Sequence, residues 1–161
     1  LKNKIIMKKL LLIIAFAIFG LGLNAQSVGD ETTIDYDGYS LAFRVTSVEP
    51  AECKVSDCTG TPVDVTIPST VEIEGTEFNV TSIGYYAFNY CSSLTSIEIP
   101  NSITFIGPYA CNYCSSLTSI EIPSSVTEIY GYAFESCSSL RNVTFEENSQ
   151  LITILDEAFE N

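Results

Sequence analysis

The chain contains 161 residues, of which 20 are acidic, seven are basic and none is histidine. Beyond residue 25 the formal charge is −17, because all 20 acidic residues but only Arg44, Lys54 and Arg141 lie there. Phosphate backbones and anionic membranes repel such a chain, so we expect no nucleic-acid partner. The lack of histidine excludes Ser-His-Asp and Cys-His nucleophilic catalysis and the H-E-x-x-H metalloprotease motif.

Residues 1–25 have the order of a secretory signal peptide. Four lysines within the first nine residues precede the uncharged apolar run Leu10–Leu23 and a small-residue exit that ends at Ala25. The run is shorter than the roughly 20 residues that a membrane helix needs. We therefore expect cleavage after Ala25, a mature chain without a membrane span, and a secreted or cell-surface location.

Residues 26–64 lack the repeat that follows them and are expected to form a β-rich N-terminal cap, as repeat arrays require. An Asp-Gly pair at positions 37 and 38 interrupts the β-rich stretch Tyr36–Val48, which predicts a hairpin. Cys53 and Cys58 follow in the polar segment ECKVSDC. In an exported protein they either form a disulfide or are two unrelated thiols.

Residues 65–161 contain a repeat of 23 residues. The decapeptide CSSLTSIEIP occupies Cys91–Pro100 and recurs at Cys114–Pro123, and a looser copy begins at Cys137. A partial unit with an expanded middle precedes these copies, which makes about four rungs. The last rung stops just after an Ala-Phe pair, so the array looks truncated at its C-terminus.

The apolar spacing within a rung predicts short strands. Ile97 and Ile99 are two positions apart, the period of a strand with one buried face, and Pro100 ends that strand. A second short extended segment is expected near Ile106, and a tight helical turn should close the rung. One rung cannot bury its apolar face alone. We therefore predict a β-rich solenoid, a right-handed leucine-rich-repeat-like stack with rungs about 4.8 Å apart.

The pattern C-S-S-L-T-S-I-x-I-P-x-S-[VI]-T-x-I-x-x-Y-A-F resembles the BspA-like leucine-rich repeats of bacterial surface proteins. The resemblance covers about residues 65–161. It implies a secreted or surface-displayed solenoid that binds proteins of a host matrix or of another cell in an adhesive role. It implies neither a catalytic motif nor a cofactor. Cys111 departs from the pattern, because the other rungs have phenylalanine at this position.

Outward-facing strand positions form the first candidate binding face. Small polar side chains alternate there with carboxylates or threonine, and solenoids present such sheets to partners. An ordinary solvated sheet face is the alternative explanation. The six candidates are Ser96, Glu98, Ser119, Glu121, Asn142 and Thr144.

A second candidate surface consists of tyrosines on the turn side of the rungs. Tyrosine combines a large apolar ring with a polar tip, which suits protein interfaces, although some of these rings must pack between rungs. The set is Tyr85, Tyr86, Tyr90, Tyr109, Tyr113, Tyr130 and Tyr132.

Other chemical motifs receive structural interpretations. Cys111 and Cys114 have C-x-x-C spacing, but they belong to different repeat columns, which favours buried packing over redox or zinc chemistry. Glu98 and Glu121 leave glycoside hydrolysis open only in principle, because both should be solvated. We predict a non-enzymatic protein-binding module without metal or cofactor. The alternatives are a spacer in a longer surface protein and a carbohydrate-binding module.

Overall fold

The structure is a computed structural model that describes residues 26–161. The signal peptide expected at residues 1–25 lies outside the described residues. Strands and turns make up the described part, and it contains no helix long and apolar enough for a membrane crossing. In chain order the strands are β1 (Glu31–Asp35), β2 (Tyr39–Val48), β3 (Ala51–Gly60), β4 (Asp64–Thr66), β5 (Thr70–Ile73), β6 (Thr76–Ile83), β7 (Ser96–Glu98), β8 (Phe105–Ile106), β9 (Ser119–Ile122), β10 (Glu128–Ile129), β11 (Asn142–Phe145) and β12 (Thr153–Ile154).

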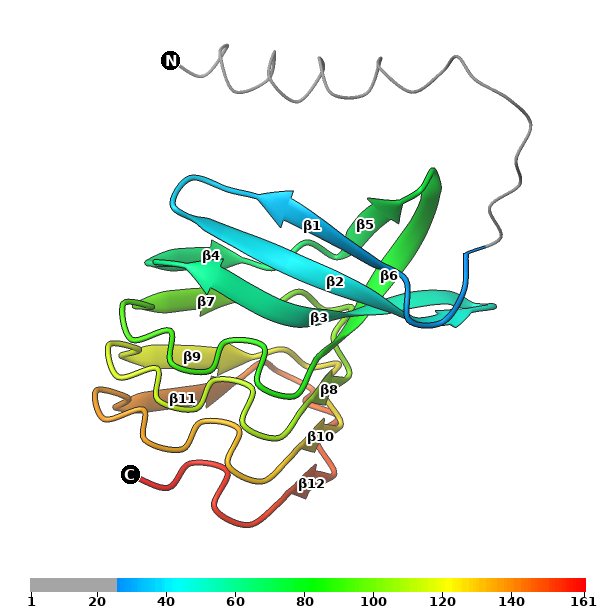
Figure 1. Cartoon of the computed structure of the whole chain (residues 1–161). Coiled ribbons are helices and arrows are strands. Elements are labelled where there is room, and N and C mark those ends of the chain that lie inside the picture. The colour runs from blue at the N-terminus through cyan, green and yellow to red at the C-terminus, as the bar shows by residue number, and fades with distance from the viewer. Residues whose placement is uncertain (1–25) are drawn as a thin grey trace, which may run out of the picture.

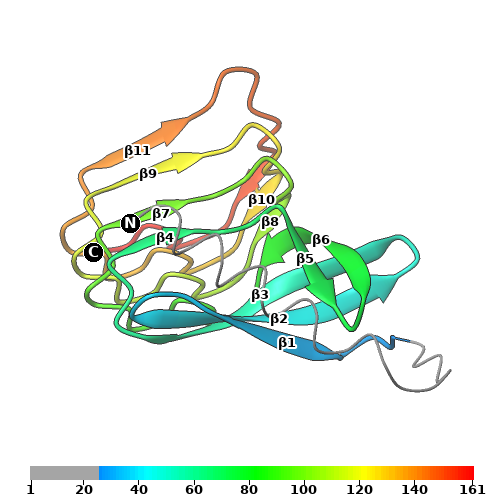
Figure 2. The same cartoon turned by 90° about the horizontal axis from the view of Figure 1, so that it is seen from above.

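The predicted solenoid is confirmed, with two strand positions in each rung (Figure 1). One side of the stack carries β4, β7, β9 and β11, and another carries β6, β8, β10 and β12 (Figure 2). Equivalent residues pair in parallel from rung to rung, as Ile83, Ile106, Ile129 and Ile154 do on the second side. The repeat in the sequence is therefore a repeat in space.

The third side of each rung consists of turns and not of the helical turn expected from the sequence. Tyr86 and Tyr109 have positive φ angles of 62° and 55°, which interrupt any right-handed helix. The backbone N–H of Phe88 donates to the carbonyl of Ala110 in the next rung at 2.7 Å. The same bond recurs one rung later from Cys111, also at 2.7 Å. The turns therefore form a further rung-to-rung hydrogen-bond ladder.

The core is built from columns of equivalent side chains. Leu94 and Leu117 are fully buried, and so are Phe88 and Phe134 of the turn side. Cys111 takes the phenylalanine position between those two rings and is also fully buried. Each column packs apolar side chains against one another. This burial stabilises the fold by roughly 25 cal/mol for each Å² of apolar surface removed from water.

The cap is a meander of β1, β2 and β3 that joins the stack through β6. The predicted hairpin is confirmed, with Gly38 at a φ of 88° in its turn. β3 pairs in parallel with the second half of β6, which also pairs with β8 of the next rung. The first half of β6 forms a hairpin with β5 in the expanded unit. Cap and repeats therefore share one eight-stranded sheet.

The disulfide considered between Cys53 and Cys58 is excluded by this geometry. Both residues lie on β3, in a strand and not in a loop, and both thiols are free. Five residues along a strand span about 16 Å at about 3.3 Å per residue. A disulfide requires Cα atoms about 4.4–6.8 Å apart. The polar residues around Cys53 suggested a loop, but they belong to a strand with one buried face.

The loss in free energy of unfolding when a repeat leucine is truncated should depend on how deeply that leucine is buried. Leu117 is fully buried, whereas its equivalent Leu140 is only half-buried. We expect Leu117→Ala to lower the free energy of unfolding by about 2–5 kcal/mol and Leu140→Ala to lower it clearly less. Urea denaturation of both variants measures the difference. Equal losses would contradict the assignment of Leu117 to the interior of the stack.

Glycine should stabilise the fold at some of the positions where a non-glycine residue has a left-handed backbone conformation. Ser136 has a φ of 57°, and its side chain makes no hydrogen bond with a described residue. A left-handed conformation costs a non-glycine residue about 1–2 kcal/mol. Glycine avoids this cost, but it loses more chain entropy on folding, which offsets part of the gain. Ser136→Gly should therefore raise the free energy of unfolding by about 0.5–1 kcal/mol. Ser138→Gly, outside the left-handed positions, is the control and should not raise it.

Candidate functional site

The six residues predicted as a binding face lie together on the outer surface of β7, β9 and β11. All six are exposed, while the isoleucines between them point inward. The register aligns Ser119 with Asn142 and Glu121 with Thr144. The structure thus places the predicted residues in two adjacent columns.

Two further members of these columns come from the first rung. β4 pairs with β7, which sets Asp64 beside Ser96 and Thr66 beside Glu98. The sequence pattern did not reveal them because the first rung lacks the CSSLTSIEIP sequence. Only the strand register assigns Asp64 to the column of serines. We call the eight residues of β4, β7, β9 and β11 in these two columns the outer face.

The outer face is divided in the middle. β4 pairs with β7, and β9 with β11, but β7 and β9 form no ladder although they are neighbours in the stack. A shallow groove of about 320 Å³ opens between them. Ile97 and Ile99 keep 7% and 9% exposure, against 3% and 0% for the equivalent Ile120 and Ile122, so the opening reaches the core. The groove is lined by Ser96, Ile97, Glu98, Ile99, Ser119, Ile120, Glu121 and Glu146.

The groove carries negative charge. Its lining contains three carboxylates, those of Glu98, Glu121 and Glu146, and no basic residue. Glu98 accepts a hydrogen bond from the hydroxyl of Thr66 at 3.2 Å. Glu146 accepts the backbone N–H of Ser124 at 2.9 Å, and this bond lowers its pKa. Glu98 and Glu146 therefore accept hydrogen bonds only from neutral groups, which leaves their negative charge available to a cation or a cationic side chain.

Asp64 closes one end of the outer face. Its Oδ1 accepts hydrogen bonds from Ser96 Oγ at 2.6 Å and from Thr95 Oγ1 at 2.9 Å. These two bonds, the one from Ser96 first, lower the pKa of Asp64. The hydroxyl of Ser119, in the equivalent place one rung later, makes no side-chain hydrogen bond to a described residue. The hydroxyl of Ser119 on β9 is therefore available to a ligand, whereas that of Ser96 on β7 is already bonded to Asp64.

The tyrosines of the turn side form the second predicted surface. Tyr90 stacks on Tyr113 with ring centroids 4.7 Å apart, and Tyr109 stacks on Tyr132 at 4.8 Å. A hydrogen bond with Glu157 raises the pKa of Tyr132 to about 12. Because stacked rings cover one another's faces, this surface offers mainly ring edges and hydroxyl groups to a partner.

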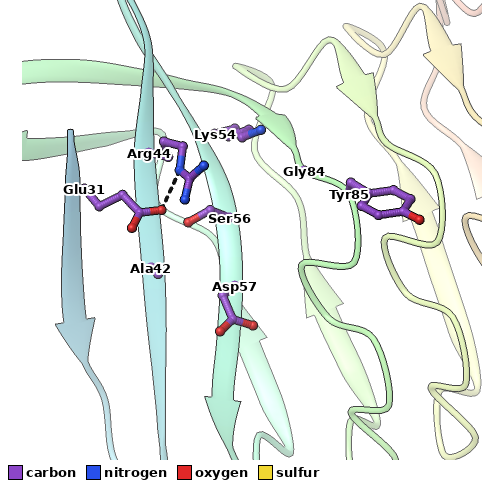
Figure 3. A pocket seen from close by; sticks show the side chains of 8 residues that line it. All are labelled: Glu31, Ala42, Arg44, Lys54, Ser56, Asp57, Gly84 and Tyr85. Atoms are coloured by element: carbon purple, nitrogen blue, oxygen red, sulfur yellow. Dashed lines mark hydrogen bonds and ion pairs between the residues drawn. The ribbon is translucent and has the colours of Figure 1, made fainter. Parts of the chain in front are cut away.

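A depression that sequence patterns did not predict lies where the cap meets the first rung (Figure 3). Its volume is about 480 Å³. Arg44 and Lys54 stand opposite each other on β2 and β3, and Arg44 Nε donates to Glu31 at 2.6 Å. The lining also contains the carboxylates of Glu31 and Asp57, so the two positive and two negative side chains leave it with no net charge. Residues of β1, β2 and β3 meet only in the folded sheet, which is why no local motif marks them.

The C-x-x-C pair is structural. Cys111 and Cys114 are both fully buried, in separate columns, as the alignment predicted. Cys114 Sγ donates to the carbonyl of Phe88 at 3.1 Å. A hydrogen bond with Cys111 and burial raise the pKa of Cys114, so its thiol stays protonated at neutral pH. Within residues 26–161 no three His, Cys, Asp or Glu side chains are grouped so as to hold a metal ion.

Comparisons with known proteins agree with this geometry. The family model described as BspA type leucine rich repeat region matches residues 64–161 in six copies. No curated protein matches the chain. A leucine-rich repeat protein from Bacteroides ovatus is 32% identical with a TM-score of 0.68, over 79% of this chain and 32% of that protein.

Two further solved structures share the fold. The T. pallidum leucine rich repeat protein is 27% identical with a TM-score of 0.63, over 77% of this chain and 54% of its own. A leucine-rich repeat protein from Bacteroides capillosus is 24% identical with a TM-score of 0.60, over 77% of this chain and 98% of its own. The chain thus spans about a third of the B. ovatus protein and about half of the T. pallidum protein.

The bonds to Asp64 predict a change in its titration. Removal of the Ser96 hydroxyl by Ser96→Ala should move the pKa of Asp64 upward, toward the ordinary value of an aspartate side chain. The lowered folded pKa stabilises the fold above the unfolded pKa, and this stabilisation is lost as pH falls through the folded pKa. NMR titration of the Asp64 carboxyl measures the shift. Ser119→Ala is the matched control, and an equal shift in both variants would contradict the assignment.

Proposed function

The chain belongs to the family of BspA-type leucine-rich repeat proteins, and on that premise we propose that it is an exported, cell-surface module that binds a protein partner. The partner is a component of a host matrix or of another cell's surface. Contact is made through the outer face, and the β7–β9 groove is the observation that carries the proposal. Support for export comes from the order of residues 1–25 and from the surface proteins that the repeats resemble.

The groove favours an extended, basic protein segment as the ligand. β7 and β9 form no ladder with each other, so backbone groups along the groove are available to a chain that lies there. Glu98 and Glu121 are exposed on its two sides, and the described part of the chain is strongly acidic. Lysine or arginine side chains of a partner would meet complementary charge, which favours rapid association and selects against acidic partners.

The proposal includes the absence of catalysis. Glu98 and Glu121 occupy equivalent positions on a solvated sheet face, and both side chains are exposed. A glycosidase needs one of its two carboxyl groups kept protonated in an apolar pocket. The shallow groove offers no such environment to either residue, and the chain has no histidine to serve as a general base.

Two other functions compete with protein binding. A spacer within a longer surface protein is favoured by the identity of the outward residues, since Ser96 and Ser119 match and so do Glu98 and Glu121. A carbohydrate-binding role is favoured by the exposed ring of Tyr85 beside the charged residues of the cap depression. Neither alternative explains why the groove opens within the outer face.

Charge neutralisation in the groove tests the proposal. The mature chain is measured against immobilised 12-residue peptides of defined net charge, basic and acidic. Basic peptides should bind, and Glu98→Gln/Glu121→Gln should weaken them about three- to tenfold through the loss of two exposed ion pairs. Added salt should weaken binding to the unmodified chain more than to this variant.

The matched control is Glu72→Gln/Glu77→Gln, which removes the same charge from exposed positions of the β5–β6 hairpin. Equal weakening in both double variants would mean general charge attraction and would contradict a site in the groove. Failure of every peptide to bind would favour the spacer.

A further inference from the structure

The basic side chains beyond residue 25 are not spread evenly over the molecule. Arg44 and Lys54 lie on the cap, and only Arg141 lies among the repeats. The strand register sets Arg44 directly opposite Lys54, and it sets Glu31 on the other side of Arg44. Like charges that face each other across two strands lower stability. The cap therefore holds two cations side by side at a cost to its own stability.

One cation of this row has no counter-ion within the described part of the chain. Glu31 accepts Arg44 Nε at 2.6 Å, but the two Nη groups of Arg44 make no hydrogen bond with a described residue. Lys54 Nζ makes neither an ion pair nor a hydrogen bond with a described residue. Asp57 uses Oδ1 to accept the backbone N–H of Cys58 at 2.9 Å. The depression therefore keeps free cationic donors although its lining is neutral overall.

A β-bulge on β3 adds a hydroxyl group to the depression. Phe43 pairs with Val55 and Ala42 pairs with Asp57, so Ser56 is the extra residue between the two pairs. Bulges often lie beside functional sites, where they redirect a side chain. Ser56 Oγ is buried and has no hydrogen-bond partner among the described residues, whereas most buried polar groups have one. Figure 3 shows this hydroxyl directed toward the charged side chains of β1 and β2.

The first rung contributes an aromatic ring to the same depression. Tyr85 follows β6 and is 53% exposed. A Cβ atom added at Gly84 would lie 3.2 Å from Cδ of Lys54, so the lysine stem passes against the backbone that precedes the tyrosine. The volume of about 480 Å³ lies within the range of about 300–1,000 Å³ that is usual for small-molecule sites.

We propose that the cap depression binds an acidic sugar, a uronic acid residue of a polysaccharide. The carboxylate of the sugar pairs with Lys54 and accepts hydrogen bonds from the Nη groups of Arg44. The sugar hydroxyl groups bond to Ser56 Oγ and to the carboxylates of the lining. The exposed ring of Tyr85 lies against the apolar face of the sugar ring.

The two signs of charge in the lining favour a sugar over a simpler anion. Glu31 and Asp57 repel a phosphate group or the clustered carboxylates of an acidic peptide. A uronic acid has one carboxylate beside several hydroxyl groups, which donate to carboxylates and accept from cations. No lining residue belongs to β4, β7, β9 or β11, so the site is separate from the outer face. The inference therefore adds a second ligand and does not depend on the proposed protein contact.

The experiment titrates the nitrogen-15-labelled mature chain with trigalacturonate and follows the backbone amide signals by NMR. Trigalacturonate should shift the signals of residues 54–57 and of Tyr85. Its methyl ester lacks the negative charge and should bind about two- to fivefold more weakly, which is the loss expected for one exposed ion pair. The spectrum of each variant without ligand shows that the variant is folded.

The matched variants are Lys54→Gln and Arg141→Gln, which remove the same charge from the cap and from the repeats. Lys54→Gln should weaken trigalacturonate about two- to fivefold, whereas Arg141→Gln should leave its affinity unchanged. Equal weakening by both variants would mean general charge attraction and overturns the site.

The unmodified chain tests the proposal without any variant. The absence of shifts at millimolar trigalacturonate, or shifts confined to residues outside the depression, overturns the inference. Triglutamate is the peptide control, and it should bind more weakly than trigalacturonate. Binding of triglutamate at equal or higher affinity would assign the depression to an acidic protein segment and overturns the assignment to a sugar.

Tyr85→Ala tests the part of the aromatic ring. This variant should weaken trigalacturonate, because the sugar ring loses the apolar surface against which it lies. An unchanged affinity for trigalacturonate overturns the sugar-stacking role of Tyr85.

Discussion

The structure depends on one constraint, the stacking of each side chain on its equivalent in the next rung. Parallel strands hold successive rungs about 4.8 Å apart, and the stacked pair Tyr109 and Tyr132 has ring centroids 4.8 Å apart. A core residue of an inner rung is therefore buried like its equivalent in the next inner rung, and an outward residue stays outward. This constraint converts a 23-residue period in the sequence into core columns, a column of tyrosines and two columns of polar residues.

The departures from that regularity are the informative places. The outer face opens between β7 and β9, although these strands have identical sequences in their core positions. The column of buried cysteines Cys91, Cys114 and Cys137 ends at Cys91, because the cap takes the place of a preceding rung. The cations Arg44 and Lys54 lie at the same junction, in the cap and away from the acidic repeats. Because the rungs are otherwise alike, a partner can recognise one particular place on the stack only where a rung differs from its neighbours.

Charge and backbone geometry act together in the groove. Glu98 and Glu121 alone would describe a solvated acidic face, which many soluble proteins have. Their position beside strand edges that form no ladder adds directed backbone groups to the charge. The combination favours an extended basic segment over a diffuse cation cloud, because charge steers a partner while hydrogen bonds fix its register.

The sequence by itself determined the solenoid, the buried columns of Leu117 and Cys114, and the outward direction of Ser96 and Glu98. It could do so because alternation and recurrence act locally and repeat identically. It did not determine the left-handed turns at Tyr86, where a hydrogen bond to the next rung holds a conformation that tyrosine rarely adopts.

Only the tertiary structure decided contacts between unlike segments. It separated Cys53 from Cys58 along one strand. It brought Asp64 into the column of Ser96 and opened the groove between β7 and β9. Asp64 and Ser96 come from rungs with different sequence patterns, whereas the groove opens between two strands with the same core sequence. Periodicity predicts which residues stack on their own copies, but the meeting of cap and repeat depends on how the whole chain packs.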